Sequence, residues 1–169
     1  MASCSQKSKP WLNATVGILH DVGKIVTLLL RRKYPNIKDI ISMVDESSIG
    51  ACLLRSWEFP ENILQIIAEQ YAPEFTHPLH LQSEYKDELA VLYLAHVCYD
   101  LLLGESTVST IFVDEYLHLL DLAPYSCQEF YQLKLLPALL KHKKRLPDKI
   151  AARLHEQSLG AEISFGRAS

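Results

Sequence analysis

The sequence lacks a strong excess of charge of either sign. Its 169 residues carry 17 Lys and Arg against 20 Asp and Glu, which gives a formal net charge of −3. Proteins that bind nucleic acid usually show a strongly basic patch or stripe, and this balance supplies none. We therefore expect no nucleic-acid partner. Because 49% of the residues are hydrophobic, the chain has enough apolar material for the core of one domain.

Long apolar runs are also missing. The run from Ile25 to Leu30 is interrupted by Thr27, whereas a bilayer span requires roughly 20 consecutive apolar residues. The N-terminal residues are mostly polar and no long apolar run follows them, so the sequence shows no secretory signal. We expect no membrane partner and a cytoplasmic location.

Closely spaced cysteine pairs are absent. Cys4, Cys52, Cys98 and Cys127 are far apart and form no CxxC motif, which excludes zinc-finger and zinc-ribbon sites because these need paired ligands. Disulfide pairing is open on number alone, but a chain without an export signal is expected to keep free thiols. We interpret Cys52 and Cys98 as small residues of the core.

Alternating strand patterns are nearly absent, and only Val108 to Val113 is β-prone. Apolar residues instead recur at helical spacing, which predicts an all-α fold, a bundle of about seven helices. Asp45 or Ser47 is placed to cap one helix, and Gly104 to end the longest. The predicted helical segments are residues 11–33 with a bend or break at Gly23, 37–44, about 47–57, 61–71, 83–103, 113–120, 126–142 with a kink at Pro137, and a last piece from Pro147.

The patterns divide the chain into four parts. Residues 1–10 are a polar tail, 11–104 form the helical core, 105–158 form a C-terminal helical extension packed on that core, and 159–169 are a loose tail.

One histidine–aspartate pair, His20 and Asp21, lies between an apolar helical turn and Gly23-Lys24. An imidazole and a carboxylate side by side at a helix bend can both reach one divalent ion. Lys24 is a candidate phosphate contact, or else a solvated helix lysine. In the structural alternative, Asp21 accepts backbone or lysine donors at the bend and His20 packs inside.

The segment Gly17–Ile25, GILHDVGKI, resembles the HD superfamily signature LLHDIGK. Residues Gly50–Glu61, GACLLRSWEFPE, resemble the GA-LL--W-LPE segment of the HDOD branch, and Leu94-Ala95-His96 stands where that family often has Leu-Ala-Asp. The resemblance covers about Leu12 to Gly104. It implies an HD/HDOD-like helical fold used in bacterial signalling and regulation.

The chain departs from the ligand pattern of that family. An HD phosphohydrolase brings a first histidine from a helix upstream of the pair, whereas His20 is the first histidine here. Ser48 stands where the HDOD pattern often has a histidine, and Gln70-Tyr71 where it often has His-His. We therefore expect a depleted site with no cofactor or one weakly held divalent metal ion. The implied metal ligands are His20, Asp21 and His96, with Asp100 in reserve.

His96 also has a structural interpretation. Its helical neighbours at Leu92, Tyr93, Tyr99 and Leu103 are apolar or aromatic, so it is expected to face inward. A lone histidine on such a face is more often a hydrogen-bonded core residue than a ligand.

Two further features have a structural and a functional interpretation. Trp57 and Phe59 are large enough to be core anchors, and a partner surface near them is the alternative. The basic run Lys141–Arg145 is interpreted as a solvated helix end, and a contact with nucleic acid or acidic lipid is the alternative.

Together these observations predict a signal-transduction or regulatory domain that acts through a protein partner or self-association and has no catalytic residues. The alternative is a metal-dependent phosphohydrolase acting on a nucleotide or cyclic dinucleotide, in which Lys24 stabilises phosphoryl charge. The helical portion that usually precedes the pair is nearly missing, so we also expect an exposed apolar face.

Overall fold

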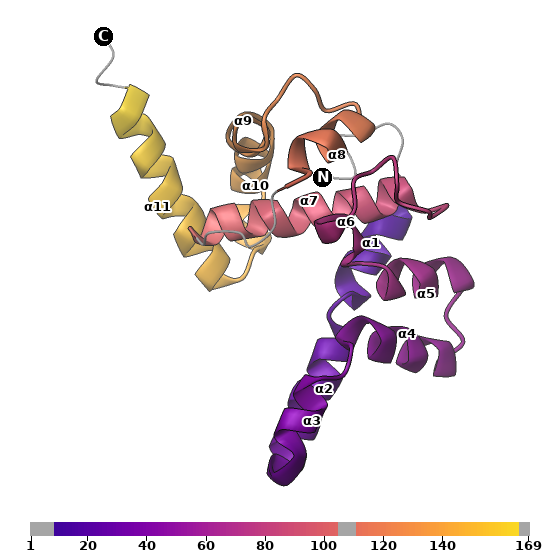
Figure 1. The fold of residues 1–169 in the computed structure, drawn as a ribbon. Helices are drawn as coiled ribbons and strands as arrows, with labels where there is room; N and C mark the ends of the chain where they lie inside the picture. The colour runs from indigo at the N-terminus through magenta and orange to yellow at the C-terminus, as the bar shows by residue number, and fades with distance from the viewer. Residues whose placement is uncertain (1–8, 105–110, 166–169) are drawn as a thin grey trace.

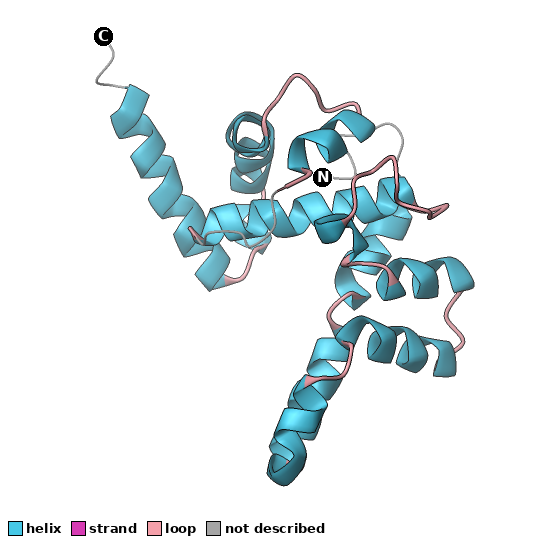
Figure 2. Ribbon diagram, in the orientation of Figure 1, coloured by secondary structure: helices cyan, strands magenta, loops and turns pink. Residues whose placement is uncertain are grey.

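The computed structural model describes residues 9–104 and 111–165, with side chains described as far as residue 157. Every regular element in these residues is helical, which confirms the all-α class (Figure 2). There are more and shorter helices than the seven or so expected, because several predicted segments are split. The α-helices are α1 (Pro10–Leu19), α2 (Val22–Lys33), α3 (Lys38–Ser42), α4 (Glu46–Ser56), α5 (Glu61–Ala68), α6 (Ala72–Phe75), α7 (Lys86–Leu103), α8 (Val113–Leu119), α9 (Cys127–Phe130), α10 (Leu136–Lys141) and α11 (Asp148–Phe165).

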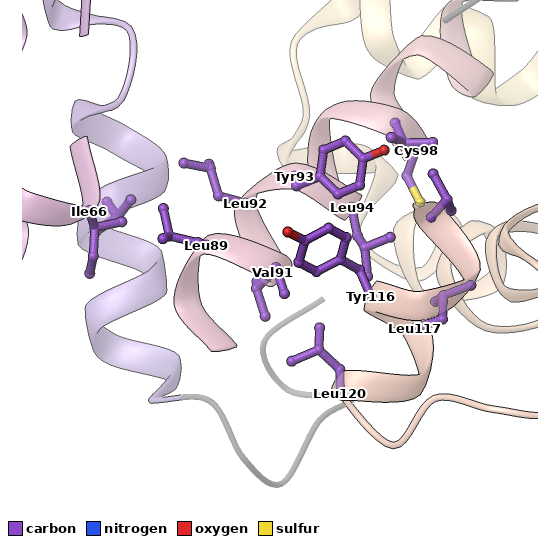
Figure 3. Close-up of a cluster of buried hydrophobic side chains, with 14 of the residues drawn as sticks. Ile66, Leu89, Val91, Leu92, Tyr93, Leu94, Cys98, Tyr116, Leu117 and Leu120 are labelled. Atoms are coloured by element: carbon purple, nitrogen blue, oxygen red, sulfur yellow. The ribbon is translucent and has the colours of Figure 1, made fainter. Parts of the chain in front are cut away.

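Helix α7 is the centre of the fold. It contacts α1 and α6 on one side and α8 and α11 on the other (Figure 1). The helix is apolar around most of its circumference, as expected for a helix covered on all sides. Figure 3 shows Leu89 and Leu92 of α7 directed towards Ile66 of α5, and Tyr93 close to Tyr116 of α8. The Tyr93 and Tyr116 rings meet edge to face at a centroid distance of 5.2 Å.

One buried cluster extends from Leu12 in α1 to Leu154 in α11. Parts of three expected segments lie outside the described residues: 1–8 of the N-terminal tail, 105–110 of the C-terminal extension and 166–169 of the loose tail. The first half of the β-prone segment, residues 108–110, is among them, and its last residue, Val113, begins α8. Pro10, expected in the N-terminal tail, is the first residue of α1. The backbone of α11 is helical to Phe165, past the expected start of the loose tail at residue 159.

The sequence placed a bend at Gly23, and the structure corrects this position. The chain turns at His20-Asp21, between α1 and α2, and Gly23 is a buried residue within α2. A Cβ atom on Gly23 would lie 1.8 Å from the carbonyl oxygen of Glu46 and 2.8 Å from the amide nitrogen of Gly50. Gly23 is therefore required because the backbones of α2 and α4 pass too close together for any side chain at this point.

Three predicted helix ends are confirmed. Asp45 is the N-cap of α4, and its carboxylate accepts hydrogen bonds from the backbone N–H groups of Ser47 and Ser48. Gly104 ends α7 in the left-handed conformation with a φ of 73°. Ser126 begins α9 in a capping box with Glu129. Each cap satisfies backbone groups that the helix itself leaves without partners.

The kink expected at Pro137 takes the form of a π-helical turn. The turn η2 (Tyr131–Leu135) joins α9 to α10, and Pro137 lies in the first turn of α10. Proline has no N–H and its ring crowds the carbonyl four residues earlier, so a wider turn just before it relieves both problems.

The described residues contain one stretch that passes a length and composition test for a membrane span, Pro10–Lys33. The expectation of no span rested on uninterrupted apolar runs, whereas the averaged hydropathy of this stretch tolerates Thr27. Core helices of soluble proteins pass the same test. This stretch is divided by the turn at His20-Asp21.

The crossing of α2 and α4 leads to a prediction for Gly23→Ala. The added methyl group overlaps backbone atoms that cannot rotate away, so we expect a loss of about 3 kcal/mol in the free energy of unfolding. Gly17→Ala is the matched control, because no atom lies within 4 Å of a Cβ at Gly17. This control is expected to be neutral or stabilising by about 0.5–1 kcal/mol. Urea unfolding of both variants measures the difference, and equal stabilities would contradict the close crossing.

The cap at Asp45 leads to a pH-dependent prediction. The Ser48 hydroxyl is the largest of the contacts that lower the pKa of Asp45 below its usual value. Its stabilising effect is therefore present above the unfolded-state pKa of about 4 and is lost as the pH falls through the folded-state pKa.

We expect Asp45→Ala to reduce the free energy of unfolding by about 1 kcal/mol at pH 7. The difference from wild type should shrink below about pH 4. Asp45→Asn, which retains a capping oxygen, should show a smaller loss at pH 7, and this loss should also shrink at low pH because the wild-type Asp45 is the group that titrates. Thermal unfolding at several pH values measures this, and a constant Asp45→Ala effect down to pH 2 would contradict it.

Candidate functional site

The turn between α1 and α2 presents His20 and Asp21 side by side. The Nδ1 atom of His20 lies 2.8 Å from the carbonyl oxygen of Gly17, and because a carbonyl only accepts, Nδ1 carries the donated hydrogen. The Nε2 atom faces Asp21 Oδ2 at 3.3 Å. A neutral His20 ring therefore presents the lone pair of Nε2 beside the carboxylate, as a metal-binding histidine does.

The structural interpretation of this pair, in which Asp21 accepts backbone or lysine donors and His20 packs inside, agrees with the structure only in part. Asp21 is the N-cap residue of α2, but its side chain makes no capping hydrogen bond. Its carboxylate is instead directed to His20. His20 is partly exposed rather than packed inside.

Helix α7 brings His96 to the same place. The ring centroids of His20 and His96 are 5.0 Å apart, with the planes tilted by 45°. Burial, followed by the positive charge available at His20, lowers the pKa of His96 below its usual value. His96 is thus an inward-facing histidine, as its apolar neighbours predicted, and it also faces the histidine–aspartate pair.

A pocket of about 640 Å³ opens in front of these three residues. Its lining comes from the α1–α2 turn, from α6 and the residue before it, and from α7. Lys24 and Asp100, which the sequence singled out, are part of this lining. The pocket residues are Gly17, His20, Asp21, Lys24, Tyr71, Glu74, Leu92, Ala95, His96, Tyr99 and Asp100.

Glu74 is the pocket residue that sequence reasoning missed. Burial, followed by the charge of Asp100, raises the pKa of Glu74 above its usual value. Tyr71 lines the same wall, and burial followed by the charge of Asp21 raises its pKa. Their spacing of three residues around a short helix was the available signal, since it places both on one face.

The positions where the chain departs from the HDOD pattern separate into two groups. Gln70 is buried, and its amide Nε2 donates a hydrogen bond to the carbonyl oxygen of His20 at 3.2 Å. Gln70 therefore stabilises the turn between α1 and α2. Tyr71 lines the pocket. Ser48 is elsewhere, on α4, where its backbone N–H and hydroxyl bind the Asp45 cap.

The side chains at this pocket can supply two ligands to one metal ion but not three. Two atoms that bind one ion at about 2.1 Å are roughly 3 Å apart, so His20 Nε2 and Asp21 Oδ2 can share an ion. Within residues 9–104 and 111–165, however, no three His, Cys, Asp or Glu side chains are placed to hold one. We therefore derive no catalytic step through a metal at this pocket.

A second feature is an apolar surface on the projecting α2–α3 arm, residues 22–44, at one end of the molecule (Figure 1). The most exposed of its large side chains include Leu29 at 60%, Ile40 at 64% and Met43 at 86%. We call this surface the arm face; its residues are Ile25, Leu28, Leu29, Ile37, Ile40, Met43 and Val44.

An apolar groove of about 440 Å³ borders the arm face between α2 and α4. Its lining residues are Val26, Ser48, Ile49, Cys52 and Leu53. The sequence predicted Cys52 as a small core residue and Trp57 as a core anchor. The structure corrects this, because Cys52 is exposed and Trp57 is 56% exposed.

The residues of α4 that are in fact buried are mostly small: Ser47, Gly50, Ala51 and Leu54. In α2 they are Gly23 and Thr27. The two helices contact each other through these small residues, and most of their larger apolar side chains lie outside this contact. Cys98 and Phe59, by contrast, do pack in or against the core as expected.

The arm is basic although the chain is not. Residues 22–44 contain five Lys or Arg and one Asp, whereas the whole chain has a net charge of −3. Arg31 is partly neutralised by Glu46 at 3.5 Å. Arg32, Lys33 and Lys38 are exposed around the apolar residues. The arm face is therefore an apolar surface with a basic rim.

In a comparison with protein families, the sequence model of the HDOD domain matches residues 1–73. The match includes the His20-Asp21 pair and the Gly50–Glu61 segment on which the resemblance rested, and it ends before His96. Comparisons with curated proteins and with solved structures give no match. The match over residues 1–73 is consistent with a partial HDOD domain.

Proposed function

We propose that this chain is a regulatory HDOD module that binds an acidic, amphipathic segment of a partner protein on its arm face. The observation that carries the proposal is the set of large apolar side chains on α2 and α3 that the rest of the chain leaves uncovered. Scattered exposed apolar residues are ordinary, but a contiguous patch beside a groove is typical of an interaction site.

The physical gain comes from covering these side chains. Burying one Leu or Ile side chain contributes roughly 1.5–3 kcal/mol, so three or four anchors are enough for micromolar binding after the cost of association. The groove between α2 and α4 accepts side chains from an approaching helix, in the manner of helix-in-groove recognition.

The basic rim favours the charge of the partner. A net positive arm attracts acidic residues at the edge of an interface and increases the rate of association. Two arms would repel each other, which disfavours a symmetric contact between two copies through this face. An acidic partner is therefore favoured over self-association.

The pocket around His20 supports a non-catalytic role for this module. Two adjacent ligands hold a cation weakly, whereas catalytic zinc sites usually have three protein ligands and one open position. A metal-dependent phosphohydrolase is the second candidate, and one observation favours it: His20, Asp21, Lys24 and His96 all line the same pocket.

Two designed helical peptides test the binding proposal. Both carry leucines at the same helical spacing, and their polar faces consist of Glu in one and Lys in the other. We expect the Glu peptide to bind the wild-type chain, and Leu29→Glu or Ile40→Glu to weaken binding about tenfold or more, since each removes an apolar anchor. Fluorescence polarisation measures both.

Leu133→Glu is the matched control, because Leu133 is an exposed leucine outside the arm. It should bind the Glu peptide as wild type does. Equal binding of both peptides, or binding of anionic lipid vesicles but of neither peptide, would overturn the proposal of an acidic protein partner.

Metal reconstitution tests the non-catalytic role. After incubation with Mn²⁺, Fe²⁺ or Zn²⁺ and dialysis, elemental analysis should find well under one metal ion per chain. Bis-p-nitrophenyl phosphate should not be hydrolysed above background. Stoichiometric metal together with turnover that His20→Ala and Asp21→Ala abolish would establish the phosphohydrolase instead.

A further inference from the structure

The pocket in front of His20 is acidic, although the motif beside it resembles that of the HD phosphohydrolases. Its lining has three carboxylates, Asp21, Glu74 and Asp100, and one lysine, Lys24. The three acidic residues are partly buried, whereas Lys24 is exposed. Charges inside a pocket act through a medium of lower dielectric constant than charges in water, so the carboxylates determine the potential within it. The pocket therefore attracts cations and repels phosphate groups.

The carboxylates occupy two positions in the pocket. Asp21 Oδ2, in the α1–α2 turn, lies 3.3 Å from His20 Nε2, and the ring of His20 lies 5.0 Å from that of His96. Asp100 follows His96 by four residues on α7, which is about one helical turn or roughly 6 Å further along the same face. Burial and then the charge of Asp100 raise the pKa of Glu74, which places Glu74 at the Asp100 end of the pocket. One acidic position is therefore at the turn, and the other is about one turn of α7 away from it.

The rest of the lining is mostly apolar and aromatic. Leu92 and Ala95 of α7 line the pocket together with Gly17 of α1, and Tyr71 and Tyr99 add two phenol rings. Apolar side chains accept an alkyl chain, and aromatic faces attract ammonium groups. At about 640 Å³, the pocket is within the size usual for small-molecule sites, on the order of 300–1,000 Å³.

We propose that this pocket binds a linear aliphatic polyamine. One ammonium group pairs with Asp21, and a second pairs with Glu74 and Asp100. The alkyl chain between them packs on Leu92 and Ala95. Ammonium groups need only hydrogen-bond acceptors at about 2.7–3.2 Å, whereas a tightly held metal ion requires several ligands at fixed short distances. The pocket meets the first requirement with carboxylates at two positions, and it does not meet the second.

The polyamine site goes beyond the proposed binding of an acidic partner and does not depend on it. The arm face and this pocket share no residue. Leu29→Glu, which removes an apolar anchor of the arm face, should therefore bind the polyamine as the wild-type chain does. The two proposals can fail separately for this reason.

Isothermal titration calorimetry of the full chain with spermidine, at fixed ionic strength, tests the site. We expect saturable binding of one spermidine per chain and no binding of inorganic phosphate. Asp100→Asn and Glu74→Gln should each weaken spermidine binding about tenfold, since each removes a charge-assisted hydrogen bond. Glu84→Gln is the matched control, because Glu84 is an exposed carboxylate outside the pocket and its removal changes the net charge by the same amount. It should bind spermidine as the wild-type chain does.

Lys24→Ala separates a polyamine ligand from a phosphate ligand. Removal of this cation should tighten spermidine binding about twofold to fivefold, whereas a phosphate site would lose affinity. Circular dichroism checks that each variant is folded, and Lys24→Ala still decides if a carboxylate variant does not fold, because Lys24 is exposed. The proposal is overturned by the absence of saturable spermidine binding, by weaker binding of spermidine to Lys24→Ala, or by equal losses in Glu84→Gln and Asp100→Asn. Binding of phosphate in place of spermidine would also overturn it.

Discussion

The contact on which this structure depends is the close crossing of α2 and α4 at Gly23 and Gly50. The Glu46 carbonyl oxygen occupies the space where a Cβ of residue 23 would lie. Thr27 is buried at the same interface, where its hydroxyl donates to Glu46 Oε1 at 2.8 Å. Because small and polar residues make most of this contact, most of the large apolar residues of both helices remain on the outside, with Leu54 as a buried exception. The exposure of these large apolar residues produces the arm face and the groove beside it.

The crossing also holds the turn at His20-Asp21. Asp21 begins the helix that Gly23 ties to α4, and Gln70 at the end of the α5 region donates to the His20 carbonyl. The histidine–aspartate pair is thus fixed from two directions, and α7 supplies His96 opposite it. The turn therefore holds the two side chains in place within the segment that matches the HDOD model.

Much of the fold was predictable from local chemistry. Periodicity gave the all-α class, and the residues Asp45, Gly104 and Ser126 marked helix ends because their side-chain or backbone geometry satisfies groups near their own position. The faces of α2 and α4 were not predictable in this way. Apolar spacing shows that Ile25, Leu29 and Cys52 share faces, but not whether another helix covers them. The pocket was likewise predictable only in part. His20 and Asp21 are adjacent in the sequence and form a recognisable motif, whereas Glu74 reaches the pocket only through tertiary packing.

The most direct measurement for the central claim is hydroxyl-radical footprinting of the side chains in the free, monodisperse protein. The account predicts that Leu28, Leu29 and Ile40 are oxidised at rates close to that of the exposed Leu133, and that Leu54 of α4 is protected. Protection of the arm residues in the free monomer, at the level of Leu54, would contradict it, because the apolar face would then already be covered.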